Sequence, residues 1–193
     1  MIIHINGWPG VGKKTIGEAL SKMLGARFIH NHLLHDVALV CAGFESECRW
    51  DLYETVRLAA YTALEHRPSS ETFVMTNALC SDNPREEMAW KHVVELAVRR
   101  RVPLVPVVIE ANIEENVRRL QSPERVGKKM IDGVELREWF QRYSIQRPNV
   151  SELIVMDVSS FSAEEAAQTI LAHLDSLRSK LRPATLQHLK LMR

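Results

Sequence analysis

Short apolar runs alternate along the chain with longer segments in which apolar residues recur every three or four positions. The short runs predict strands, and the periodic segments predict amphipathic helices. The predicted strands are residues 2–6, 26–30, 72–76, 103–109 and 153–156. The predicted helices are residues 16–24, 36–43, 49–66, 113–120, 134–143 and 163–181, with a further helix beginning at 82–84. The chain is therefore expected to alternate between strand and helix through most of its length.

This alternation favours an α/β fold with a parallel sheet, because right-handed helical crossovers join parallel neighbours. The run 103–109 is almost entirely apolar, which is typical of a strand covered by helices on both faces. Ligands in such folds bind beyond the carboxyl ends of the strands. We expect one domain over residues 1–181. For the tail, residues 182–193, the sequence predicts a short helix that either docks on the domain or binds a partner.

Composition adds few constraints. The chain has 193 residues, of which 46% are hydrophobic and 25% are charged, as in ordinary globular proteins. Its net charge of +1 gives no general attraction to nucleic acid or to a membrane surface. Cys41, Cys48 and Cys80 show no paired spacing, and no apolar run is long enough to span a bilayer. With no leader-like segment before the first strand, we expect a cytoplasmic protein without a membrane partner.

The stretch 7–15 (GWPGVGKKT) lies between the first predicted strand and the first predicted helix. Glycines let the backbone curl so that successive N–H groups point at a phosphate, and the helix N-terminus adds partial positive charge. Lys13 can reach the outer phosphates of a nucleotide. The candidate phosphate-binding residues are Gly7, Pro9, Gly10, Val11, Gly12, Lys13, Lys14 and Thr15. An ordinary glycine turn before a basic helix start is the alternative.

The position of the hydroxyl residue distinguishes this loop from the usual phosphate-binding pattern. Ser or Thr normally follows the lysine directly. Here Lys14 stands in that place, and Thr15 comes one position later. This spacing resembles the variant found in adenylate-kinase-like proteins. By that resemblance, Thr15 is the candidate ligand for a metal ion.

The order of the parts over residues 1–178 resembles the P-loop kinases of the adenylate, shikimate and gluconate kinase group. The resemblance implies a three-layer P-loop NTPase fold, with a five-stranded parallel sheet in the order 2-3-1-4-5 and helices on both faces. It also implies ATP and Mg²⁺ as ligands, an acceptor-binding segment at about 31–66 and a lid at about 121–133. The stretch Asn31-His32-Leu33 resembles one found in small bacterial kinases of this group.

The same resemblance implies roles for four cationic residues. Lys13 would contact the outer phosphates, and Arg125 occupies the place of a catalytic lid arginine. Arg118 occupies the place at which the group stacks a guanidinium on adenine. The stretch from Glu54 to Arg57 resembles the one with which shikimate kinases bind an acceptor anion. A solvated surface is the alternative for Arg57 and for the basic lid.

Two departures from the group concern its carboxylates. Residues 30–32 (HNH) stand where shikimate-type kinases carry aspartates, and Thr76-Asn77 stands where Walker-B-type sites carry a carboxylate. The nearest carboxylates by sequence are Asp36, Asp82 and Glu110. We take His32 and Asp36 as the candidates for the base that accepts a proton from the acceptor. A purely structural histidine is the alternative for His32.

These observations predict an ATP-dependent phosphotransferase that acts on a small acceptor. A metabolite hydroxyl is favoured over a nucleoside monophosphate, because the acceptor segment carries no clear base-binding signature. An ATP-binding regulator or a catalytically weak NTPase is the alternative from another class, and the missing carboxylates favour it. Nucleic acid is disfavoured as a partner, because the basic segment 118–129 lacks interleaved aromatic residues. We expect a monomer or a homodimer, and the identity of the acceptor stays open.

Overall fold

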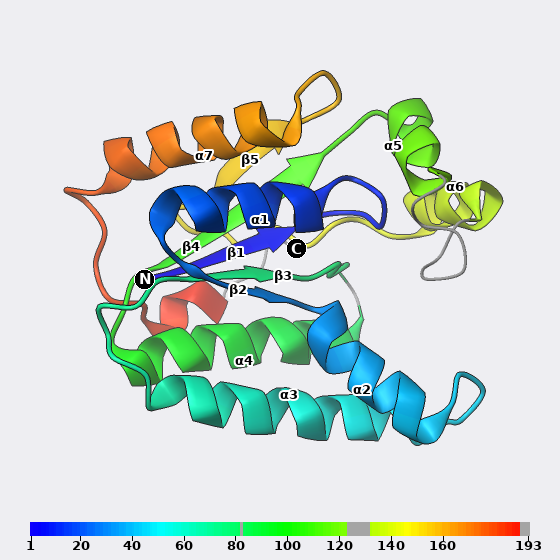
Figure 1. Cartoon of the computed structure of the whole chain (residues 1–193), viewed down its shortest axis with the longest axis horizontal. Helices are drawn as coiled ribbons and strands as arrows, with labels where there is room; N and C mark the ends of the chain where they lie inside the picture. The colour runs from blue at the N-terminus through cyan, green and yellow to red at the C-terminus, as the bar shows by residue number, and fades with distance from the viewer. Residues whose placement is uncertain (82, 123–131, 190–193) are drawn as a thin grey trace.

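A five-stranded parallel sheet forms the centre of the molecule (Figure 1). The computed structural model describes residues 1–81, 83–122 and 132–189. The strands are β1 (Ile2–Asn6), β2 (Arg27–His30), β3 (Phe73–Thr76), β4 (Leu104–Glu110) and β5 (Ile154–Asp157). They lie in the order β2-β3-β1-β4-β5, and each neighbouring pair is parallel. The predicted sheet type and strand order are confirmed.

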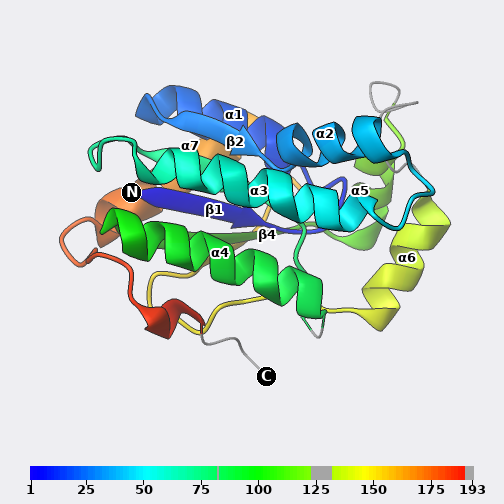
Figure 2. The same ribbon diagram turned by 90° about the horizontal axis from the view of Figure 1, so that it is seen from below.

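Helices cover both faces of this sheet. The helices in the described residues are α1 (Lys13–Leu24), α2 (His32–Ala42), α3 (Arg49–Glu65), α4 (Pro84–Arg100), α5 (Ile113–Leu120), α6 (Gly133–Arg142), α7 (Ala163–Leu177) and the 3₁₀ helix η2 (Leu186–Leu189). Figure 1 and Figure 2 show α1 and α7 on one face and α3 and α4 on the other, which confirms the three-layer architecture. Within the described ranges, none of these helices has both the length and the apolar character needed to cross a membrane.

The central strand β1 is apolar at successive positions because its side chains pack on both faces of the sheet. Ile3 and Ile5 belong to the core cluster on the α1 and α7 side, whereas Ile2 belongs to the cluster on the α3 and α4 side. All three are fully buried. The ring of His4 lies 5.3 Å from the ring of Trp90 on α4. A strand covered on one face only would need apolar residues at alternate positions.

Helix α2 begins at His32, so the predicted start four residues later was wrong. The carbonyl oxygen of Asn31 accepts hydrogen bonds from two backbone N–H groups of the next turn, both at 3.1 Å. The side-chain oxygen of Asn31 accepts hydrogen bonds from Tyr53 and Asn77. Tertiary hydrogen bonds therefore fix this helix start, and the local pattern of apolar residues does not contain them.

Two other helix limits differ from the prediction by three or four residues. Helix α1 begins at Lys13 rather than at 16, because its first turn is polar and so does not contribute to the apolar periodicity. Helix α7 ends at Leu177 rather than at 181. The backbone N–H groups of Lys180 and Leu181 both bond to the carbonyl oxygen of Leu177, at 2.7 and 3.0 Å, as the chain turns away.

The tail docks on the layer that contains α4. The indole N–H of Trp90 donates a hydrogen bond to the carbonyl oxygen of His188 at 2.8 Å. The backbone N–H of Ala184 donates to the carbonyl oxygen of Val102 at 2.9 Å. Leu189 packs against the core cluster on the same side. The described part of the tail is therefore docked on the domain, which was one of the two alternatives predicted for it.

Candidate functional site

A glycine-rich loop connects β1 to α1 beyond the carboxyl end of the strand (Figure 1). At Gly7 a Cβ atom would lie 2.4 Å from the carbonyl oxygen of Ile109 on β4. Gly10 has a φ of 90°, in the left-handed region, and a Cβ atom there would lie 3.1 Å from the carbonyl oxygen of Asn116. Both positions therefore favour glycine strongly. The resulting curl of the backbone is the shape that a phosphate cradle requires.

The two lysines at the start of α1 have different surroundings. The ammonium of Lys13 donates hydrogen bonds to the carbonyl oxygens of Gly7 and Trp8, both at 2.7 Å, and so lies against the loop. Lys14 is exposed and forms an ion pair with a glutamate one helical turn later, at 3.5 Å. Thr15 is exposed in the first turn of the helix. The structure therefore brings Lys13 together with the glycine loop and leaves Lys14 on the helix surface.

Helix α5 braces the glycine loop from outside. The side-chain amide of Asn116 donates a hydrogen bond to the carbonyl oxygen of Pro9 at 3.0 Å. Arg119 donates from Nη1 to the carbonyl oxygen of Val11 at 3.1 Å and from Nη2 to the carbonyl oxygen of Val158 at 2.8 Å. One guanidinium thus joins the loop, α5 and the segment that follows β5.

Arg118 and Arg119 are neighbours on α5, but the side chain of Arg119 is only 20% exposed, whereas that of Arg118 points largely into solvent. Arg118, to which the resemblance assigns adenine stacking, has a side chain that is 73% exposed and that bonds to Glu115 at 2.6 and 2.7 Å. Hydrogen bonds from Arg118, and then from Arg119, lower the pKa of Glu115 to about 2. Arg119 was not among the site residues predicted from the sequence. Its spacing of three residues from Asn116, which places both on one helix face, is the signal that the sequence contains.

Trp8 connects the loop to α6. Its ring stacks on the ring of Phe140, with centroids 4.5 Å apart and an interplanar angle of 24°. Both belong to a small third cluster of apolar side chains, which also includes Leu120 of α5 and Leu136 of α6. Most of the segment between α5 and α6, which the sequence analysis predicts as the lid, lies outside the described residues. Arg125 lies outside them as well.

A line of hydrogen bonds leads from the core to the predicted acceptor segment. His4 Nε2 lies 2.9 Å from Asn77 Oδ1, and Asn77 Nδ2 donates to Asn31 Oδ1 at 2.9 Å. Tyr53 of α3 donates to the same oxygen of Asn31. Burial lowers the pKa of His4 to about 4, against the opposing effect of the Asn77 hydrogen bond, so the ring is neutral near pH 7 and Nε2–H is the donor. A network of neutral groups therefore occupies the place expected for carboxylates.

Arg57 lies inside the protein, with only 4% of its surface exposed, which excludes the solvated surface considered for it. Its guanidinium lies 4.3 Å above the ring centroid of Tyr53 and donates to Glu54 at 2.8 Å. His92 Nδ1 of α4 lies 2.8 Å from the other carboxylate oxygen of Glu54. Arg57 is therefore paired within a charged cluster between α3 and α4, as buried charges usually are.

His32 and Asp36, the two predicted candidates for the acceptor base, lie together at the start of α2. His32 Nδ1 is 3.6 Å from Asp36 Oδ1, and His35 Nδ1 is 4.0 Å from the same oxygen. The ring of His35 lies 5.7 Å from the ring of Trp50 on α3. Burial, followed by the charge of Arg49, lowers the pKa of His35, and Asp36 opposes this shift. The structure thus adds His35, which the sequence analysis missed, to the predicted pair.

Comparison with known proteins bears on the fold. No protein-family model and no curated protein matches the chain. A Chloroflexus aurantiacus j-10-fl structure described as a candidate kinase matches with a TM-score of 0.67 at 20% identity, over 91% of this chain and 96% of that one. A gluconokinase from Sinorhizobium meliloti 1021 matches with a TM-score of 0.60 at 20% identity, over 92% and 93%. The shikimate kinase from Acinetobacter baumannii in complex with shikimate matches with a TM-score of 0.58 at 18% identity, over 94% and 95%.

The chain has the P-loop kinase fold. At these identities the likeness concerns the fold alone. The fold that the resemblance implies, including its strand order, is therefore confirmed. The activity and the site residues need their own argument.

The carboxylates near the loop of this P-loop kinase fold differ in their surroundings. Glu110, at the end of β4, is held in an ion pair, and Asp82 lies outside the described residues. Glu86 of α4, which the sequence analysis did not consider as a site residue, accepts a hydrogen bond from the backbone N–H of Cys80. Burial raises the pKa of Glu86, and burial followed by Glu86 raises the pKa of Cys80 to about 12 against the charge of Lys13. Glu86 is therefore a partly buried carboxylate bonded to Cys80, and the charge of Lys13 acts on the Cys80 thiol.

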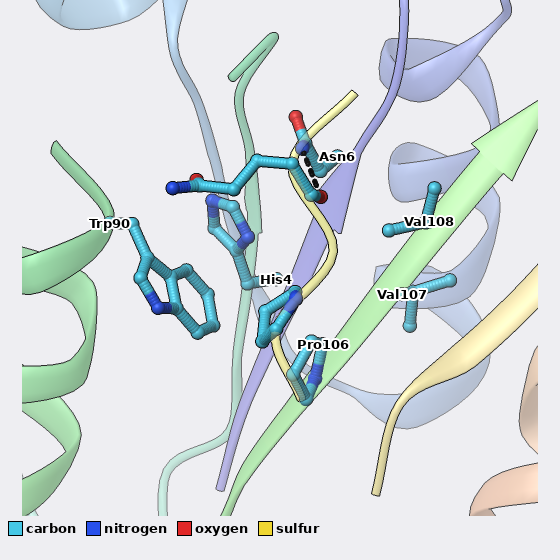
Figure 3. Close-up of a pocket in the computed structure, with 8 residues that line it drawn as sticks. His4, Asn6, Trp90, Pro106, Val107 and Val108 are labelled. Carbon is cyan, nitrogen blue, oxygen red and sulfur yellow. Dashed lines mark hydrogen bonds between the residues drawn. The ribbon is translucent and has the colours of Figure 1, made fainter. Parts of the chain in front are cut away.

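Two hollows in the described part of the chain differ in size and openness. Figure 3 shows the smaller one, where His4 of β1 lies beside Trp90 of α4 and side chains fill the space between the strand and the helix. The larger one is an open hollow of about 540 Å³ at the connection between α2 and α3 and the start of α4. Its lining includes Phe44, Arg49, Trp50 and Arg85. It lies within the predicted acceptor segment and is therefore the candidate site for an acceptor.

Proposed function

We propose that the protein is an ATP-dependent phosphotransferase that moves the γ-phosphoryl group to a hydroxyl of a small metabolite. The phosphate loop is the observation that carries this proposal, with its backbone curled at Gly7 and Gly10 and the Lys13 ammonium against it. Phosphoryl transfer depends mainly on positioning and on charge stabilisation. Backbone N–H groups of the curled loop, the N-terminus of α1 and the Lys13 ammonium would supply both the positioning and the charge stabilisation of a phosphate. Two proteins of the same fold, a gluconokinase and a shikimate kinase, carry small metabolites in their names.

The acceptor is proposed to bind at the open hollow between α2, α3 and α4. Arg49 and Arg85 line this hollow together with Glu45 and Glu47, so it offers both hydrogen-bond donors and acceptors and suits a polar acceptor that carries several hydroxyl groups. Trp50 lines the hollow and also contacts His35, beside the two candidates for the acceptor base. Arg57 is also proposed to contact the anionic group of an acceptor, which would then replace Glu54 as the hydrogen-bond partner of the guanidinium. A nucleoside monophosphate is the alternative acceptor of the same reaction.

Mg²⁺ is the proposed cofactor, and the residues present fit it. Thr15 is exposed in the first turn of α1 and would hold the ion through its hydroxyl oxygen. Glu86 is the described carboxylate that could bind water molecules of its shell. When bound, Mg²⁺ neutralises charge on phosphate oxygens. Arg118 is proposed to stack on adenine, and Arg125 to contact the phosphates from the lid.

A cytoplasmic location and a monomeric or homodimeric state complete the proposal. Cys41 and Cys48 are exposed free thiols, and Cys80 is a buried one. Free thiols persist in reducing compartments, which supports the location. The small-molecule acceptor is the proposed partner of the site.

A second candidate function is that of an ATP-binding regulator without efficient transfer. The amide network favours it, because Asn77 is bonded to His4 on one side and to Asn31 on the other. A neutral amide cannot accept a proton from a hydroxyl at neutral pH, and it adds no negative charge beside Mg²⁺. Such a protein would bind ATP through the same loop and transfer phosphate slowly.

The test measures ATP binding and phosphoryl transfer side by side. Transfer of labelled γ-phosphate is followed with Mg²⁺ over a panel of hydroxy acids, sugars and nucleoside monophosphates. Lys13→Ala should lose ATP binding and transfer, whereas Lys14→Ala is the matched control and should keep both, because that side chain lies on the helix surface. Transfer to a metabolite supports the kinase, and ATP binding without transfer supports the regulator. Failure of the unaltered protein to bind ATP would overturn both.

A further inference from the structure

Three metal-ligating side chains gather on one face of the first turns of α2. Their ligand atoms all lie within 4.8 Å of one another. The spacing of three and four residues from His32 to His35 and Asp36 explains this, because it brings side chains to the same helix face. We propose that His32, His35 and Asp36 bind one late first-row divalent metal ion, with Zn²⁺ as the representative.

The distances between the ligand atoms suit such an ion. Zn²⁺ binds imidazole nitrogen and carboxylate oxygen at about 2.0–2.2 Å, so the donors of a tetrahedral site lie roughly 3.4 Å apart. The distance from His32 Nδ1 to Asp36 Oδ1 is already 3.6 Å. The distance from His35 Nδ1 to the same oxygen is 4.0 Å, and a small change of side-chain angles closes the difference. Because all three ligand atoms lie within 4.8 Å of one another, movements of about 1.4 Å or less in each donor–donor distance bring them to the tetrahedral spacing.

The donor set indicates the class of metal. Two imidazoles and one carboxylate occur in open zinc sites, where a fourth position stays available for water or a small-molecule oxygen. Imidazole nitrogen suits zinc, copper, nickel and iron, whereas Mg²⁺ takes oxygen ligands and keeps much of its water. This site is thus distinct in chemistry from the Mg²⁺ site proposed at Thr15, and while it holds a metal ion neither His32 nor Asp36 serves as the acceptor base.

The backbone that carries the ligands is fixed by neighbouring elements. Asn31 immediately precedes the first turn, and its side-chain oxygen accepts hydrogen bonds from Tyr53 of α3 and from Asn77 after β3. The ring of His35 lies 5.3 Å from the ring of Tyr53 and 5.7 Å from that of Trp50. Ligands on a rigid element bind a metal more readily than ligands that must first be ordered.

Two features oppose a cation at this place. The N-terminus of α2 carries partial positive charge, and the charge of Arg49 acts on His35. Water weakens the effect of the helix terminus at His32 and Asp36, whose side chains are 43% and 60% exposed, and weakens that of Arg49 less, because the side chain of His35 is only 21% exposed. The carboxylate of Asp36 also supplies a compensating negative charge. The same exposure gives a metal ion access from solvent.

The test is independent of ATP and of the proposed kinase activity. It uses the untagged, metal-free chain with Cys41→Ser and Cys48→Ser, because exposed thiols bind Zn²⁺ by themselves. Calorimetric titration with Zn²⁺, without nucleotide, should give one saturable site per chain. Titration with Co²⁺ should give the visible absorption band of a four-coordinate ion at the same stoichiometry.

Single substitutions then locate the site. His32→Gln and Asp36→Asn change exposed side chains, and each should weaken Zn²⁺ affinity by at least about tenfold. His66→Gln changes an exposed histidine that follows α3 and should leave the affinity unchanged. Circular dichroism checks that each variant is folded. A titration without a saturable site would overturn the proposal, as would equal affinities in the Asp36→Asn and His66→Gln variants.

Discussion

Arg119 donates a hydrogen bond from Nη1 to the carbonyl oxygen of Val11, over 3.1 Å. Val11 lies within the phosphate loop, and the same guanidinium reaches the carbonyl oxygens of Val158 and Ser159 after β5. One side chain thus ties the loop to a segment almost 150 residues later in the chain. The shape of the loop depends on this tertiary contact as well as on its glycines.

Arg119→Ala should therefore destabilise the protein and loosen the phosphate loop. The substitution removes hydrogen bonds from a charged donor, each worth roughly 1.5–3 kcal/mol. We expect a lower midpoint in urea unfolding and a weaker affinity for ATP. Arg118→Ala is the matched control, because Arg118 is exposed and bonds to Glu115 on the same helix. It should leave the unfolding midpoint nearly unchanged.

ATP affinity separates the two roles of these arginines. If Arg118 stacks on adenine, Arg118→Ala weakens ATP binding without a change in stability. Equal stability of the Arg119→Ala variant and the unaltered protein would contradict the bracing role of Arg119.

Thr15→Val should reduce Mg²⁺-dependent transfer by roughly tenfold or more, because it replaces the proposed ligand oxygen with a methyl group. Thr15 is exposed in the first turn of α1, so the fold should tolerate the change. Thr15→Ser keeps the hydroxyl and should keep most of the activity. The measurement is the transfer rate as a function of Mg²⁺ concentration. Full activity in Thr15→Val would show that another residue meets the ion.

The strands and the glycine-rich loop could be predicted from the sequence because their signals are local, whereas the strand order was predicted only through the resemblance to the P-loop kinases. β1 is buried on both faces, so Ile2, Ile3 and Ile5 form a visible apolar run. Gly7 and Gly10 occupy positions where other residues would clash or be strained, and their spacing from Lys13 is short.

The remaining features depend on partners that are distant in sequence. Helix α2 begins early because Asn31 bonds to Asn77, and Arg57 is buried in a cluster that α4 completes. The spacing of Arg119 from Asn116 places both on one helix face, but only the position of Val11 in space shows to which group Arg119 bonds. Pairs of this kind are fixed by packing, which helical periodicity does not encode.

Arg125→Ala should lose much of the transfer rate with only a modest change in ATP affinity. A lid arginine acts on phosphate oxygens in the transition state, and such arginines contribute roughly 10³- to 10⁵-fold to turnover. Arg125→Lys should rescue poorly, because an ammonium cannot bridge two oxygens as a guanidinium does. Turnover and ATP affinity are measured for both variants. Unchanged turnover in Arg125→Ala, in an otherwise active enzyme, would exclude the lid role.

His4 should make the stability of the protein depend on pH between about 6.5 and 4. Burial lowers its pKa to about 4 in the folded state, from an ordinary value of 6.5 in the unfolded state. Between these values the unfolded chain binds a proton that the folded chain does not, so the free energy of unfolding falls as the pH falls. The loss should approach about 3 kcal/mol when the pH reaches 4, since one pKa unit corresponds to about 1.4 kcal/mol.

The comparison that isolates this effect is between His4→Gln and His173→Gln. Glutamine can still donate to Asn77 Oδ1, as His4 Nε2–H does, but it does not titrate. His173 is exposed on α7, so its substitution should leave the pH dependence intact. Urea unfolding at intervals from pH 7 to pH 4 should therefore show a shallower loss of stability in His4→Gln than in His173→Gln. Other groups that titrate in this range contribute equally to both variants, so the difference between the two curves reports His4. Parallel curves would mean that His4 has nearly the same pKa in the folded and unfolded chains, which would contradict the lowering of its pKa by burial.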